Sequence, residues 1–203
     1  MGDFLVNSAW VGPMLWAGLY VSDYCLTIAC ARMYQAQDKV VFEGSYEITP
    51  MHQRDVDALR RLSPRFMIAL VLSTAYVVFL QTFFVGLPEL YRGVLGGMVL
   101  MEATVHIRHL RNWFMFRHGT SVLHGRLMYP RIFMLRMSAV ELLLFAGLYL
   151  VLFLVTGSSF VLGGAVGCGF LSINHYRLAQ RHEASLRKAA GLDPSCGVSE
   201  SIG

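Results

Sequence analysis

Long apolar stretches dominate this sequence and limit what it can fold into. Four of them approach or exceed the roughly 20 apolar residues that cross a bilayer as a helix, and a single acid interrupts a fifth. Only 15% of the 203 residues are charged, whereas a soluble domain usually carries about a quarter. The pattern excludes an ordinary soluble enzyme and predicts an all-α fold, a polytopic integral membrane helical bundle. We place the five expected transmembrane helices at residues 11–32, 65–86, 92–113, 133–156 and 159–178.

The basic residues lie almost entirely at one end of these expected helices. With five spans, 16 of the 17 Lys and Arg residues fall on one side of the membrane, and Arg92 alone falls on the other. Because basic loops stay in the cytoplasm, we expect the N-terminus outside and the C-terminus in the cytoplasm. Anionic lipid headgroups, rather than nucleic acid, then account for the net charge of +4. The expected location is the plasma membrane, the inner membrane of a bacterium.

We expect one transmembrane domain, residues 1–190, followed by a disordered tail, residues 191–203. The tail is rich in glycine and serine and has no apolar periodicity. The longest polar insertion, residues 34–64, is expected on the cytoplasmic side. The four cysteines form no CxxC pair, and no disulfide is expected.

The insertion contains the signals of a short surface helix. Thr49 is a good N-cap and Pro50 suits the first helical position. Apolar residues follow at helical spacing as far as Leu62. Ser63 and Pro64 repeat the cap and proline signal, which predicts that the second span starts there.

Two expected spans carry glycine pairs at four-residue spacing, Gly93 with Gly97 and Gly163 with Gly167. Small residues at this spacing allow close approach of helix backbones in lipid. Both pairs are expected at similar depth near the outer surface. They therefore predict either contact between these two spans or a homo-oligomer interface.

Ionisable and amide residues recur in the cytoplasmic half of the expected bundle. Glu102, His106 and His109 stand at i, i+4 and i+7, on one stripe of a helix. An ionised side chain that faces lipid costs several kcal/mol, so such residues should point inward and form a polar cluster. The expected cluster comprises Asp23, Glu102, His106, His109, Arg136, Glu141, Asn174 and His175.

Several roles fit this cluster. It could form a path for protons, cations or a small ligand. A Zn²⁺ or iron site could use Glu102, His106, Glu141 and His175, and histidines on two helices could ligate a haem. Alternatively, the cluster is structural, with Arg108, Arg111 and Arg136 neutralising the acids in buried ion pairs.

No nucleotide-binding loop, catalytic triad or zinc-finger spacing occurs in the chain. We therefore expect a non-enzymatic membrane protein, either an oligomeric ion- or solute-conducting unit or an accessory subunit of a membrane complex. Its expected partners are anionic lipids and either further copies of itself or another membrane protein. The alternative is a membrane-embedded metalloenzyme or haem-binding protein that uses the same Glu and His residues.

Overall fold

The computed structural model describes residue 8 and residues 10–190. Within them, the main elements are five long helices. They are α2 (Val11–Gln35), α4 (Pro64–Phe83), α5 (Pro88–Phe114), α7 (Arg131–Thr156) and α8 (Ser159–Ala189). Each predicted span falls largely on one of these helices. The tail predicted to be disordered, residues 191–203, lies outside the described residues.

Three of the long helices, α2, α4 and α7, are long and apolar enough to cross a membrane by length and composition. Glycines and polar side chains make α5 and α8 less apolar, and neither qualifies by the same measure. The mostly helical bundle and its membrane character agree with the prediction.

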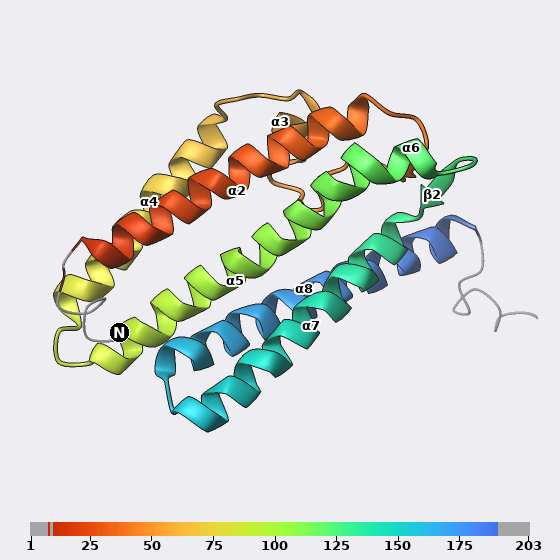
Figure 1. Ribbon diagram of the computed structural model, residues 1–203. Coiled ribbons are helices and arrows are strands. Elements are labelled where there is room, and N and C mark those ends of the chain that lie inside the picture. Colours follow the sequence, from red (N-terminus) through yellow and green to blue (C-terminus); the bar gives the residue numbers. More distant parts are fainter. Residues whose placement is uncertain (1–7, 9, 191–203) are drawn as a thin grey trace, which may run out of the picture.

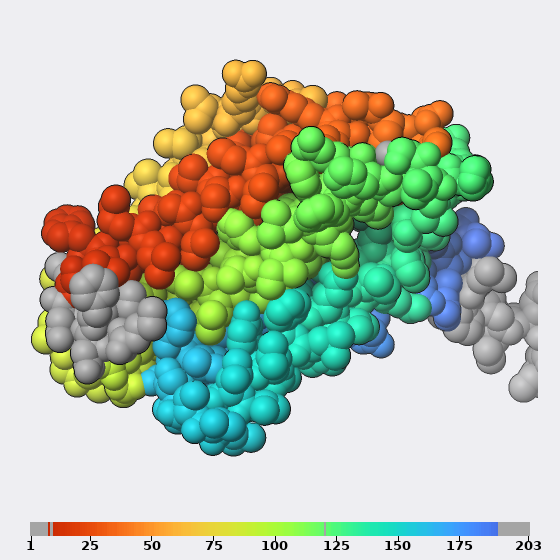
Figure 2. Space-filling view, viewed as in Figure 1, coloured from red at the N-terminus to blue at the C-terminus, as the bar shows by residue number. Residues whose placement is uncertain are grey.

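Helix α5 lies in the middle of the bundle, with α2 and α4 on one side and α7 and α8 on the other (Figure 1). We call the end where α4 meets α5 and α7 meets α8, at residues 84–87 and 157–158, the turn end. The opposite end, which carries residues 36–63 and 115–130, is the loop end. On the face seen in Figure 2, the surface is indented between α5 and α7 toward the loop end.

The glycine pairs bring α5 and α8 into backbone contact. A Cβ atom on Gly163 would collide with the backbone of Gly93 and Gly97, and one on Gly167 would lie 2.8 Å from the Gly97 carbonyl oxygen. Gly96 is equally close to the backbone of Phe160. The glycine pairs were predicted to mediate either contact between these two helices or a homo-oligomer interface. In the structure they mediate contact between α5 and α8 of one chain.

Apolar side chains fill the turn-end half of the bundle between α2, α4 and α5. The indole of Trp16 is buried there, and its Nε1 donates a hydrogen bond to Ser73 Oγ at 2.9 Å. The other buried residues of this core are Val77, Leu80, Tyr91, Leu95 and Val99. This core packs the three helices against one another.

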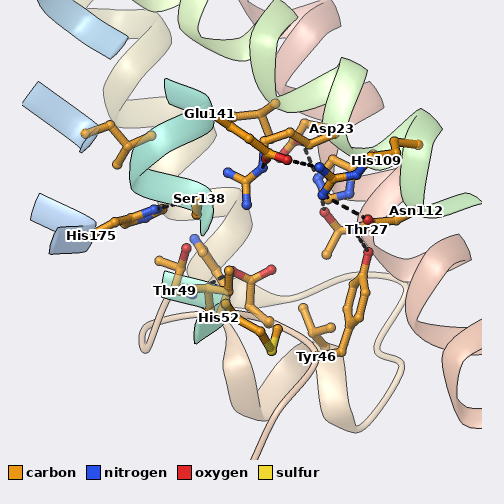
Figure 3. Close-up of a pocket in the computed structure, with 18 of the residues that line it drawn as sticks. Asp23, Thr27, Tyr46, Thr49, His52, His109, Asn112, Ser138, Glu141 and His175 are labelled. Carbon is orange, nitrogen blue, oxygen red and sulfur yellow. Dashed lines mark hydrogen bonds and ion pairs between the residues drawn. The ribbon is translucent and has the colours of Figure 1, made fainter. Parts of the chain in front are cut away.

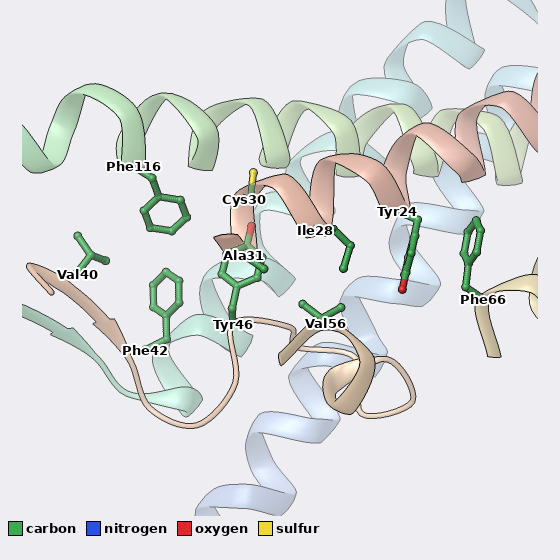
Figure 4. Close-up of a cluster of buried hydrophobic side chains, with 10 residues drawn as sticks. All are labelled: Tyr24, Ile28, Cys30, Ala31, Val40, Phe42, Tyr46, Val56, Phe66 and Phe116. Atoms are coloured by element: carbon green, nitrogen blue, oxygen red, sulfur yellow. The ribbon is translucent and has the colours of Figure 1, made fainter. Parts of the chain in front are cut away.

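The loop end is ordered by aromatic packing against α2 (Figure 4). The strands β1 (Val40–Phe42) and β2 (Leu127–Tyr129) pair in parallel, which joins the insertion to the connection between α5 and α7. A π-helix, η1 (Met115–Gly119), and one turn of helix, α6 (Thr120–Val122), precede β2. The buried cluster consists of Tyr24, Ile28, Cys30, Ala31, Val40, Phe42, Tyr46, Val56, Phe66 and Phe116.

The predicted surface helix of the insertion is present but shorter than expected. Helix α3 runs only from Gln53 to Asp57, because residues 49–52 form a turn and Leu59, with a φ of 50°, ends the helical conformation. Thr49 is therefore not its N-cap, which corrects that prediction. The next signal is confirmed, since Ser63 Oγ accepts a hydrogen bond from the Phe66 N–H at 3.3 Å and Pro64 begins α4.

Candidate functional site

A cavity of about 520 Å³ lies in the loop-end half of the molecule, between α2, α5, α7 and the insertion (Figure 3). Aromatic and methionine side chains form much of its wall. Polar residues from the insertion and from four helices, α2, α5, α7 and α8, face the same space. They are Asp23, Thr27, Tyr46, Glu47, Thr49, His52, Glu102, Arg108, His109, Arg111, Asn112, Ser138, Glu141 and His175.

On the α2 side of the cavity, Asp23 and Thr27 hold the imidazole of His109. The His109 Nε2 atom lies 3.1 Å from both Asp23 Oδ1 and Thr27 Oγ1. The Cys30 thiol donates a hydrogen bond to the His109 carbonyl oxygen at 3.5 Å. These contacts fix the ring between α2 and α5 and give Asp23 a partner that can carry positive charge.

Glu102 and His106 lie beside this pair on α5. The Glu102 side chain is buried, 6% exposed, and its Oε2 atom has no hydrogen-bond partner among the described residues. One potential ligand atom from each of Asp23, Glu102 and His106 can be chosen so that all three lie within 4.8 Å of one another. Within residues 10–190, this is the group of histidine, cysteine and acidic side chains that is close enough to hold a metal ion.

The His106 ring is oriented by two hydrogen bonds. Its Nδ1 atom lies 2.7 Å from the Glu102 carbonyl oxygen and its Nε2 atom lies 2.6 Å from Ser22 Oγ. A carbonyl oxygen can only accept, so Nδ1 carries the hydrogen. Ser22 Oγ is also 2.9 Å from the Leu19 carbonyl oxygen, which gives this hydroxyl an alternative acceptor.

The opposite wall holds a separate ionic group. Glu141 of α7 forms ion pairs with Arg111 and with Arg108, the latter at 3.3 Å. His175 of α8 is buried and its Nδ1 atom lies 2.6 Å from Ser138 Oγ. Glu141 and His175, two of the four residues proposed from the sequence as metal ligands, thus have other partners and do not join Glu102 and His106.

Two residues of the predicted cluster lie away from the cavity. Arg136 pairs with Glu183 at 2.6 Å on the exposed side of α7 and α8. Asn174 is exposed on α8 and does not line the cavity. The structure therefore gathers Asp23, Glu102, His106 and His109 on one side, places Glu141 and His175 on another, and leaves Arg136 and Asn174 outside.

The insertion contributes residues that the sequence reasoning did not select. Tyr46 is buried, and its hydroxyl accepts a hydrogen bond from Asn112 Nδ2 at 3.4 Å. Burial raises the pKa of the Tyr46 hydroxyl well above its ordinary value, so it stays neutral. His52 and Glu47 also face the cavity. The signal that could have found them is the pair of aromatic residues Phe42 and Tyr46 close together in the insertion, which predicts that this segment packs against the bundle.

The carboxylates around the cavity outnumber the guanidinium groups. Asp23, Glu47, Glu102 and Glu141 face Arg108 and Arg111. Even when His109 is counted as the cationic partner of Asp23, one carboxylate remains in excess. Chemically, the cavity can accept positive charge, and its aromatic and methionine wall can contact apolar groups.

Comparison with known protein families, with curated proteins and with solved structures finds no match to this chain.

Proposed function

We propose that this is a five-span membrane protein that takes up a cation or a small cationic solute from the cytoplasm into the loop-end cavity. In this proposal the cavity is the binding site of an ion- or solute-conducting unit. The observation that carries it is the excess of carboxylates around a partly apolar cavity in the loop-end half of the bundle.

Helix length and packing support five crossings. Helices α5 and α8 have 27 and 31 residues, and at 1.5 Å per residue each is longer than the roughly 30 Å of bilayer hydrocarbon. Both pack along apolar helices of the same bundle (Figure 1), and this packing buries Glu102 of α5 and Ser172 and His175 of α8. The 16-to-1 distribution of Lys and Arg then favours a cytoplasmic loop end.

Access from one side also follows from the packing. Thr49 lines the cavity and is exposed, so the cavity reaches the surface at the loop end. The apolar core around Trp16 separates it from the turn end. Passage of the cation across the whole membrane would therefore need either a movement of α2 against α5 or a partner protein. That partner would be a further copy of this chain or another subunit of a larger membrane complex.

A thiol placed in the cavity tests this proposal. In a background without the native cysteines, Val105→Cys puts a thiol in the cavity wall one turn from Glu102. We expect the rate ratio of a cationic to an anionic methanethiosulfonate of similar size, added from the cytoplasmic side, to be at least about tenfold higher at this thiol than at free cysteine. A tenfold ratio corresponds to about 1.4 kcal/mol, which one excess charge supplies at an effective dielectric constant of about 20.

Ala103→Cys is the matched control, because Ala103 is half-buried on the same helix and does not line the cavity. It should react slowly with both reagents. A rate ratio at position 105 equal to that at free cysteine, or lower, would contradict a cavity that selects cations.

A further inference from the structure

We propose that Asp23, Glu102 and His106 bind one divalent transition-metal ion in the wall of the cavity, with Zn²⁺, Mn²⁺ and Fe²⁺ as the class of ion. This inference rests on the proposed function, because it names a cation that the site would take. It differs from the ligand set expected from the sequence by including Asp23 and omitting Glu141 and His175.

The three side chains come from two helices that are already held together. Asp23 is on α2, and Glu102 and His106 occupy one stripe of α5. Their potential ligand atoms lie within 4.8 Å of one another. Ligands around a tetrahedral ion at 2.0–2.2 Å are about 3.5 Å apart, so small rotations of the carboxylates would close the site without moving a helix.

The surroundings of Glu102 favour a bound cation. A buried carboxylate oxygen without a hydrogen-bond partner is costly inside a protein, and more so in a membrane. Glu102 Oε2 is in this situation among the described residues, while the nearby arginines pair with Glu141 on the other wall. An ion of charge +2 between Asp23 and Glu102 would neutralise both carboxylates.

The His106 ring is arranged as metal-binding histidines usually are. Its Nδ1–H donates to the Glu102 carbonyl oxygen, which leaves Nε2 as the ligand atom. The Ser22 Oγ atom lies 2.6 Å from Nε2, close to where the ion would bind, so the Ser22 side chain must rotate away from Nε2 when an ion binds.

The composition of the site selects the ion. One imidazole and two carboxylates suit Zn²⁺, Mn²⁺ and Fe²⁺ better than Ca²⁺, which prefers six to eight oxygen ligands, or Cu⁺, which prefers sulfur. Three protein ligands leave a coordination position open, as in catalytic zinc sites. Asp23 and Glu102 both line the cavity, so that position would be accessible to a water molecule or a solute there.

Cobalt provides the test, because Co²⁺ enters such sites and its visible absorption reports direct ligation. The purified full chain in detergent, stripped with a chelator, should bind one Co²⁺ per chain, and Zn²⁺ should displace it. Glu102→Gln and His106→Asn should each weaken Co²⁺ binding by at least about 100-fold, since removal of groups that only support a ligand already costs about 10–100-fold. His124→Asn is the control, because His124 is exposed and does not line the cavity, and this variant should bind Co²⁺ like the wild type.

Ser22→Ala keeps the proposal testable if a ligand variant fails to fold. It removes only the hydroxyl that competes for Nε2, so Co²⁺ affinity should stay the same or rise, and a tenfold loss would contradict the assignment. Absence of a Co²⁺ band in the wild type, or equal binding by Glu102→Gln, would overturn the metal site. If either result is found while Val105→Cys still prefers the cationic reagent, the metal site is refuted and the proposed function of the cavity stands. If that preference is absent while Co²⁺ binds normally, only the proposed function of the cavity is refuted.

Discussion

Because α5 and α8 are in backbone contact at their glycines, replacing one of these glycines with alanine should strongly destabilise the protein. In Gly163→Ala, the new Cβ atom would lie 2.7 Å from the Gly97 backbone nitrogen and still closer to the Gly93 carbonyl oxygen. Ordinary contacts of a Cβ atom begin near 3.4 Å. The obstacles are backbone atoms, which cannot rotate away, so the two helices would have to separate.

The size of the effect follows from two opposing terms. Overpacking of a close contact costs about 1–3 kcal/mol, and rigid backbone obstacles favour the upper value. Alanine gains about 1 kcal/mol over glycine in a helix interior. We therefore expect Gly163→Ala to lower the free energy of unfolding by about 2 kcal/mol, which corresponds to a fall in Tm of about 4–8 °C for a chain of this size.

Thermal unfolding of the purified protein in detergent measures this change. Gly147→Ala on α7 is the matched control, since a Cβ atom there meets nothing within 4 Å. It should leave Tm unchanged or raise it by a few degrees. If the two variants have the same Tm, close packing of α5 on α8 does not limit stability and the reasoning is wrong.

Three further predictions concern the loop end and the cavity. The hydrogen bond from Ser63, helped by the charge of Arg60, lowers the pKa of Asp55 in the folded protein. Ionised Asp55 therefore stabilises the fold above its unfolded-state pKa near 4, and this stabilisation is lost as the pH falls through the lowered folded-state pKa. Asp55→Asn should lower Tm at pH 7, and the difference in Tm from the wild type should shrink below about pH 4. Glu141→Gln should destabilise the protein by about 3–5 kcal/mol, because it leaves the largely buried guanidinium of Arg108 without its carboxylate, and adding Arg108→Gln should recover part of the lost Tm. Phe116→Ala should cost about 3–5 kcal/mol and increase proteolytic cleavage in residues 36–63, because Phe116 is buried in the aromatic cluster that holds this segment; unchanged cleavage would contradict that role.

The positions of the long helices could be predicted because their signals are local. Apolar stretches mark all five segments, and three of the resulting helices are long and apolar enough to cross a membrane. The Ser63–Pro64 pair marks the start of α4. The glycine spacing likewise indicated which faces of α5 and α8 come close. What it could not decide was whether the contact lies within one chain or between copies.

The partners of the polar residues depend on how each helix is rotated, which the sequence does not specify. Asp23 joins Glu102 and His106 only because α2 packs on the same face of α5 that carries them. An ion pair between Arg136 and Glu141 could have been excluded from the sequence. The two residues are five positions apart, about 140° around a helix, so they lie on different faces of α7. In the structure each pairs with a residue on another helix. The pairing of β1 with β2 joins residues 87 positions apart, such as Val40 and Leu127, and no local pattern announces it.

The number and direction of membrane crossings underlie the whole account, and one position distinguishes the alternatives. If only α2, α4 and α7 cross, the connection between α5 and α7 lies outside the cell; if all five long helices cross, it lies in the cytoplasm. Ser121 in this connection is exposed, so Ser121→Cys in a cysteine-free background can be labelled with a membrane-impermeant maleimide in intact cells and in inverted vesicles. We predict labelling in inverted vesicles only. Labelling in intact cells would contradict the five-span arrangement and, with it, a cavity that opens to the cytoplasm.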